Sequence, residues 1–144
     1  MADPYSTGDL AFATLRALAS KRRLDFLVLI ATFMDANRNV DIYVKDGDNR
    51  IARFVGDEDW RVAWEAAREH DPMLNFGTFL LDHHDVQMKR LGYSYGGKGD
   101  AETINRVGKQ RLYHLAFYTK HRRGLDFWKK AQKSSDDQMS LFDV

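Results

Sequence analysis

One nearly unbroken apolar run constrains the fold of this chain most. Residues 24–30 read Leu-Asp-Phe-Leu-Val-Leu-Ile, a composition typical of a β-strand that is covered on both faces. Apolar residues at helical spacing predict a helix just before this run, starting at Asp9 and ending near Lys21. A helix that leads into a two-sided strand indicates an α/β fold.

The rest of the chain predicts further helices and one hairpin. Turn residues and apolar spacing place the helices, and an aromatic run after Gly108-Lys109 indicates a central strand. The glycine-rich residues 93–100 are expected to form a mobile loop. Trp60 and Trp64 are four residues apart, which predicts one buried helix face. The predicted helices cover 36–44, 57–69, 73–91 and 122–133, a short amphipathic segment covers 50–55, and the hairpin arms cover 102–107 and 111–119.

Length, composition and the lengths of the apolar runs exclude several classes of protein. The 144 residues are enough for one domain with its own core. The absence of cysteine excludes disulfides, Cys-ligated metal centres and a thiol nucleophile. The longest apolar run, 26–34, is too short to span a bilayer, and the first five residues lack the pattern of a signal peptide. We therefore expect a cytoplasmic protein with no membrane partner.

Several short motifs follow one another in order along the chain. They are Asp3-Pro4-Tyr5, residues 23–28 and 35–39, residues 53–56 with Trp60-Arg61, and residues 113–121 with Gly124 and Phe127-Trp128. Together they resemble the three-Cys-motif partner family. Asp3-Pro4-Tyr5 is similar to the turn with which amino-methyltransferases hold a substrate amine, so the resemblance implies a catalytic role for Asp3, Pro4 and Tyr5. It also implies a methyltransferase-like fold and a radical-SAM-like partner protein that carries three cysteines.

The chain departs from that family in one important respect. The glycine loop after the family's first strand, where S-adenosylmethionine would sit, has no counterpart here. Gly96-Gly97-Lys98-Gly99 lacks the strand–loop–helix context of a nucleotide loop. The predicted fold is therefore an incomplete Rossmann-like sheet, the C-terminal half of a class I methyltransferase-like domain. It would bind no cofactor alone and S-adenosylmethionine only with a second chain, and its open sheet edge would allow homodimerisation.

The tail carries a second resemblance. Gln138-Met139-Ser140-Leu141-Phe142 is similar to the pentapeptide that binds the bacterial sliding clamp. In this interpretation Leu141 and Phe142 fill an apolar pocket, while Gln138 and Ser140 make polar contacts. The alternative is that Leu141 and Phe142 pack on the protein's own core. The predicted organisation is a body over 1–133 and a flexible tail over 134–144, in a bacterial or phage protein.

Basic residues around the last predicted helix indicate a nucleic-acid interface. They are numerous although the net charge of the chain is only +1, so any affinity for phosphates must come from local clusters. A solvated helix face is the alternative. The candidate residues are Lys120, Arg122, Arg123, Lys129, Lys130 and Lys133, and Lys21-Arg22-Arg23 forms a second cluster.

A polar segment after the buried strand is the candidate pocket. Asp35, Asn37, Arg38 and Asn39 follow the strand's carboxyl end, where α/β proteins place their sites. Capping of the next helix is the alternative role for Asp35 or Asn37. His83 and His84 are adjacent, so on a helix they diverge by about 100° and we predict no metal site from them.

The sequence thus predicts a DNA-associated accessory protein of DNA repair or modification, tethered to the sliding clamp and without catalysis on its own. The protein would then act at sites of replication or repair, or be encoded by a mobile element. One alternative is the substrate-binding half of a split methyltransferase. Another is a small inhibitor of the clamp or of another nucleic-acid machine.

Overall fold

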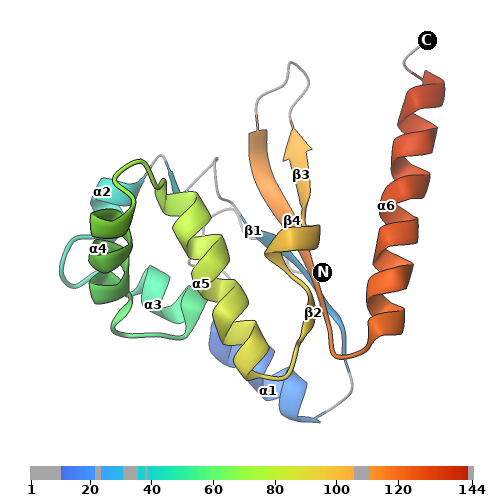
Figure 1. Cartoon of the computed structure of the whole chain (residues 1–144). Helices are drawn as coiled ribbons and strands as arrows, with labels where there is room; N and C mark the ends of the chain where they lie inside the picture. The colour runs from blue at the N-terminus through green and yellow to red at the C-terminus, as the bar shows by residue number, and fades with distance from the viewer. Residues whose placement is uncertain (1–10, 22–23, 31–35, 38, 106–110, 143–144) are drawn as a thin grey trace.

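A computed structural model describes residues 11–21, 24–30, 36–37, 39–105 and 111–142, with the backbone alone at 104–105, 111–112 and 135–142. Six α-helices, four strands and one 3-10 turn occur in these residues (Figure 1). The elements in chain order are α1 (Phe12–Lys21), β1 (Phe26–Ile30), α2 (Val40–Tyr43), α3 (Arg50–Val55), α4 (Trp60–His70), α5 (Phe76–Arg90), β2 (Tyr95–Gly96), η3 (Lys98–Asp100), β3 (Glu102–Asn105), β4 (Arg111–Thr119) and α6 (Arg122–Phe142).

The sheet is built around β4. Strand β1 pairs along one edge of β4, with Val28 opposite Ala116. On the other edge, β3 pairs with the first half of β4 and β2 with its end, where Tyr95 is opposite Thr119. The mixed α/β class is confirmed, but every pairing among the described strands is antiparallel. The apolar run of β1 correctly predicted a strand that is covered on both faces. Burial on both faces does not determine whether the strand pairs in a parallel or an antiparallel direction.

Helices cover both faces of this sheet (Figure 1). Val28, Ala116 and Tyr118 are buried on the face toward α5. The next residue along β4, Phe117, therefore points to the opposite face, where its ring stacks on Trp128 of α6 with centroids 5.5 Å apart. The sheet is the middle layer between α6 and the group formed by α1, α3 and α5.

An aromatic cluster forms the core beneath α4. Trp60 and Trp64 are both buried, as their spacing predicted. The ring of Phe76 stacks against both indoles, at 5.6 Å from Trp60 and 5.0 Å from Trp64. Stacked aromatic pairs contribute about 0.5–1.5 kcal/mol beyond their buried area. This cluster joins α4 to the first turn of α5.

Two helices differ from their predicted bounds. Helix α5 begins at Phe76 and not at 73, because the Asn75 side chain accepts a hydrogen bond of 2.8 Å from the Thr78 N–H and caps the helix there. The sequence predicted that the last helix ends at Lys133 and that residues 134–144 form a separate tail. In the structure α6 continues through residues 134–142. Serine and aspartate are weak helix formers, which is why the sequence pattern ended the helix early.

The glycine-rich stretch was wrongly predicted to be a mobile loop. Tyr95 and Gly96 form β2, and the Gly97 N–H donates a hydrogen bond of 2.8 Å to the Phe117 carbonyl. Gly96 has a φ of +85°, and an added Cβ would lie 2.0 Å from the Phe117 carbonyl oxygen. Glycine is required at this position for close approach to β4, so its presence does not indicate mobility. No helix in the described part of the chain is long and apolar enough to cross a membrane.

Candidate nucleic-acid interface

Helix α6 begins directly after the central strand. The Thr119 hydroxyl accepts a hydrogen bond of 3.2 Å from the His121 N–H at the turn. Gly124 lies so close to Thr119 that an added Cβ would be 2.4 Å from the Thr119 Oγ1. This tight junction fixes the direction in which α6 leaves the sheet.

One side of α6 is used for packing. The Trp128 Nε1 donates a hydrogen bond of 2.7 Å to the Asp100 carbonyl, and the Gln132 Nε2 donates one of 3.0 Å to the same oxygen. Gln132 also donates to the Glu102 carboxylate at 2.9 Å. Together with the stacking of Trp128 on Phe117, these contacts set the rotation of α6 about its axis.

The other side of α6 carries the predicted cations. We call Arg122, Arg123, Lys129, Lys130 and Lys133 the basic face; all five are exposed. Lys129 forms one ion pair, with Asp100 at 3.7 Å. The other four make no hydrogen bond or ion pair within the described residues. Within the residues whose side chains are described, these four charges are therefore available to an external anion.

An aromatic ring lies within the basic face. Phe127 is 70% exposed, four residues after Arg123 and three before Lys130. That spacing places the three side chains on one stripe of the helix. The sequence alone did not assign Phe127 to either side of the helix, because its position relative to Trp128 does not show which of the two rings faces the sheet.

The sixth predicted cation lies apart from the basic face. The Lys120 Nζ is 5.0 Å from the centroid of the Tyr93 ring, at the junction between β4 and α6. With Leu24, Asp25 and His121 it lines a hollow of about 290 Å³. Lys120 therefore lies just before the start of α6, next to the basic face and not within it.

Of the predicted pocket residues, the structure describes Asn37 and Asn39. The Asn37 Oδ1 accepts a hydrogen bond of 2.6 Å from the Gly77 N–H in the first turn of α5, and Asn37 lines a groove between α2 and α4. The capping alternative named the next helix, which is α2, and this contact reaches α5 instead. Asn39 immediately precedes α2, without a side-chain cap hydrogen bond. Asp35 and Arg38 lie outside the described residues.

Two further sets of predicted site residues are not tested. Asp3, Pro4 and Tyr5 lie outside the described residues. Gln138, Ser140, Leu141 and Phe142 fall in the last turns of α6, where the backbone alone is described. Binding of a sliding clamp therefore remains a prediction.

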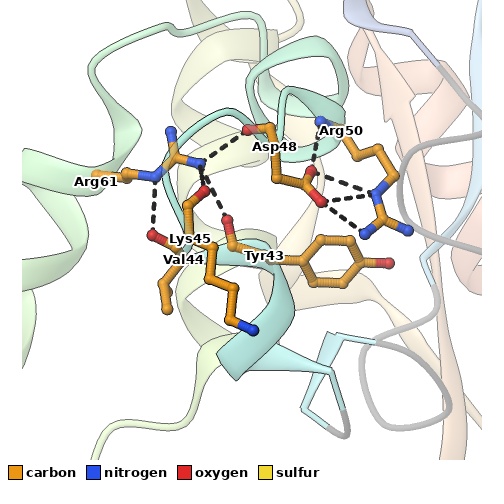
Figure 2. Close-up of polar contacts among 6 residues, drawn as sticks. All are labelled: Tyr43, Val44, Lys45, Asp48, Arg50 and Arg61. Carbon is orange, nitrogen blue, oxygen red and sulfur yellow. Dashed lines mark hydrogen bonds and ion pairs between the residues drawn. The ribbon is translucent and has the colours of Figure 1, made fainter.

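A cluster of hydrogen bonds around Arg61 fixes the loop between α2 and α3 (Figure 2). The guanidinium donates to the carbonyl oxygens of Val44, Tyr43, Lys45 and Asp48 at 3.1, 3.1, 2.7 and 2.8 Å. The adjacent Asp48 carboxylate accepts hydrogen bonds from the Arg50 guanidinium, which lower the pKa of Asp48. All of these acceptors belong to the protein itself, so Arg61 is a structural residue.

A buried histidine was missed by sequence reasoning. His84 is completely buried, its ring stacked on Phe54 at 4.9 Å and edge-on to Phe12 at 5.8 Å. Its Nδ1 lies 3.3 Å from the Tyr118 hydroxyl, and its Nε2 has no hydrogen-bond partner in the part of the chain that the structure describes. Burial and the neighbouring His83 lower the pKa of His84 to about 3, so it is neutral at physiological pH. No group of metal-ligating side chains occurs among the described residues.

In comparisons with protein-family models, curated proteins and solved structures, we found no match to this chain.

Proposed function

We propose that this chain is a DNA-binding accessory protein that contacts DNA through the basic face of α6. The observation that carries the proposal is the division of α6 into a packed side and an exposed basic side. Trp128 and Gln132 hold the packed side against η3 and β3. Four of the five outward cations keep their charge unpaired within the described residues.

The concentration of charge supports the proposal. Residues 120–133 hold six basic residues and one acidic residue, Asp126, in a chain whose net charge is +1. Lysine and arginine side chains that neutralise phosphates release counterions, which drives sequence-independent binding. The exposed ring of Phe127 adds a surface on which an unpaired base can stack, with a contribution of about 1–3 kcal/mol per base.

A finer proposal concerns the fold. We infer that the sheet corresponds to the C-terminal half of a methyltransferase-like sheet. The order of β1, β4 and β3 supports this, because the last hairpin lies against the buried strand. Binding of S-adenosylmethionine in the presence of a second chain would instead favour the split methyltransferase. If S-adenosylmethionine does not bind in the presence of any candidate partner, only the accessory role is left.

The clamp tether is a separate part of the proposal. It rests on the resemblance of residues 138–142 to the clamp-binding pentapeptide. A calorimetric titration into purified bacterial sliding clamp tests it, with Leu141→Ala/Phe142→Ala as the comparison. Saturable binding that the variant loses supports the tether, whereas no binding by the intact chain removes it.

Fluorescence anisotropy with a labelled DNA duplex and the matching single strand tests DNA binding directly. We expect Arg123→Glu/Lys130→Glu to weaken binding by at least about tenfold, because two phosphate contacts become repulsive. The matched control is Lys45→Glu/Arg53→Glu, which makes the same charge change at two exposed residues far from α6. An equal loss in both variants would show that total charge, and not the basic face, determines binding.

A further inference from the structure

A groove lies on the side of the molecule away from α6. It runs between α2, α4 and the turn before α5 and encloses about 350 Å³. Trp64 and Phe76 form its buried floor, and Val40, Val44 and Leu74 form half-buried walls. Two smaller hollows of about 300 and 120 Å³ adjoin it, and Arg68 lines all three.

The rim of this groove is apolar and acidic. Asp41, Glu65 and Glu69 line the three hollows and make no hydrogen bond or ion pair among the described residues. Arg68 lines all three hollows, with its guanidinium 5.6 Å from the Trp64 ring centroid, and Arg61, whose guanidinium donates to backbone carbonyls, lines the smallest one. Met73, in the turn between α4 and α5, is 89% exposed. The groove therefore suits an apolar side chain flanked by positive charges.

Acidic residues are also in excess in the wider region around the groove, whereas basic residues are in excess on α6. Residues 41–71, from α2 through α4, contain nine acidic and five basic residues. Residues 120–133 contain six basic and one acidic residue. The two regions lie at opposite sides of the molecule, with the sheet and α5 between them (Figure 1).

The α6 stripe, formed by Arg123, Phe127 and Lys130, is complementary to the groove in charge and in apolar character. Phe127 is an exposed apolar ring, and Arg123 and Lys130 flank it on the same side of the helix. One turn of helix rises about 5.4 Å, so the two cations are separated by about 10 Å along the axis. The α6 of a chain cannot reach its own groove across the sheet, so this complementarity can be satisfied only by another molecule.

We propose that a second copy of this chain occupies the groove, with its α6 stripe laid across α4. Phe127 packs on the floor formed by Trp64 and Phe76, while Arg123 and Lys130 face Glu65 and Glu69. The contact is head-to-tail, so one copy keeps a free groove and the other keeps a free stripe, and the assembly can grow. Because DNA would cover the same α6 stripe, DNA binding and self-association exclude each other at that surface. The self-association does not rest on the proposed DNA binding.

Sedimentation velocity of the full chain tests this inference. At low salt we expect the mean mass to rise with protein concentration, and at high salt the rise is suppressed because ions screen the contact. Glu65→Lys/Glu69→Lys should weaken association by about tenfold or more. The matched control, Asp46→Lys/Glu58→Lys, reverses two exposed acidic residues outside the groove and should associate as the unchanged chain does.

A charge exchange gives a second, independent result. The groove variant Glu65→Lys/Glu69→Lys and the helix variant Arg123→Glu/Lys130→Glu should each be monomeric alone and should associate when mixed. A chain that stays monomeric at every concentration at low salt overturns the inference, as does a mixture that fails to associate. The groove variant should still bind DNA, so a failure of self-association and a failure of DNA binding can be told apart.

Discussion

The indole N–H of Trp128 donates a hydrogen bond of 2.7 Å to the backbone carbonyl of Asp100, and this contact determines which side of α6 faces outward. It joins the helix to η3, while the indole ring stacks on Phe117 of the sheet. With Trp128 facing the sheet, Arg123 and Lys130 face away from it, and Phe127, about 100° from Trp128 around the helix, lies at the side of α6 and is 70% exposed. The basic face is therefore a consequence of a single rotation of the helix about its axis.

Replacing Trp128 tests this anchor. Trp128→Phe keeps an aromatic ring but removes the hydrogen bond, so we expect the free energy of unfolding to fall by about 1 kcal/mol. Phe127→Leu, at the exposed neighbouring position, should change stability by less than about 0.5 kcal/mol. Urea denaturation measures both. Equal stability losses in the two variants would contradict the orientation of α6 described here.

The loop between α2 and α3 should depend on Arg61. Arg61→Ala leaves four backbone carbonyls without their shared donor, and we expect a loss of about 2–3 kcal/mol in the free energy of unfolding. Arg61→Lys should recover only part of this loss, because one ammonium group cannot reproduce the planar fork of the guanidinium. Thermal unfolding followed by circular dichroism measures both variants, and full recovery with lysine would contradict the multiple-carbonyl arrangement.

The two glycines at 96 and 99 should differ sharply in tolerance. Gly96→Ala places a side chain at a φ of +85° and against the Phe117 carbonyl oxygen, and the backbone strain alone costs roughly 1–2 kcal/mol. Gly99 has open space around its Cβ position, so Gly99→Ala should leave stability within about 1 kcal/mol of the unchanged chain. Chemical denaturation of the pair measures the difference, and similar stabilities would show that β2 is not held against β4.

Stability should depend on pH through His84. Its pKa is about 3 in the folded chain and about 6.5 when exposed. Between these values the unfolded chain binds a proton that the folded chain does not, so the free energy of unfolding falls as the pH is lowered from 6.5 toward 3. The expected contribution is about 1.4 kcal/mol per pH unit.

A neutral replacement isolates that contribution. His84→Gln should flatten the fall in stability between pH 6.5 and 4, although it lowers stability at neutral pH. His121→Gln, at an exposed position, is the matched control and should leave the slope unchanged. Denaturant titrations over this pH range supply the slopes, and identical slopes for His84→Gln and the unchanged chain would contradict the assignment.

Local patterns predicted the elements better than their arrangement. The apolar run at β1 and the spacing of Trp60 and Trp64 predicted burial, because side-chain type and local spacing indicate which residues are covered. Strand direction depends on contacts with β4, almost 90 residues away in sequence, and no local pattern encodes that contact. The same holds for Gly96, whose role follows from the approach of Phe117 and not from its neighbours in sequence.

The candidate site was predictable in part for the same reason. The cations of α6 could be identified from composition, and five of the six share one helix face. Phe127 could not be assigned, because adjacent aromatic residues leave the rotation of a helix undetermined until Trp128 finds its partner on η3. Asn37, a predicted pocket residue, lines the groove around Trp64, but the rest of its lining was not predicted, since it combines residues from α2, α4 and the turn before α5.

The salt dependence of DNA binding tests the central claim most directly. The logarithm of the association constant should fall linearly with the logarithm of salt concentration, by about 0.9 for each phosphate neutralised. Four contacts, from the four unpaired cations of the basic face, predict a slope of about −3.6 for the unchanged chain and a much shallower one for Arg123→Glu/Lys130→Glu. A slope near zero for the unchanged chain, or no binding at the lowest salt concentration, would contradict the assignment of α6 as a DNA-binding surface.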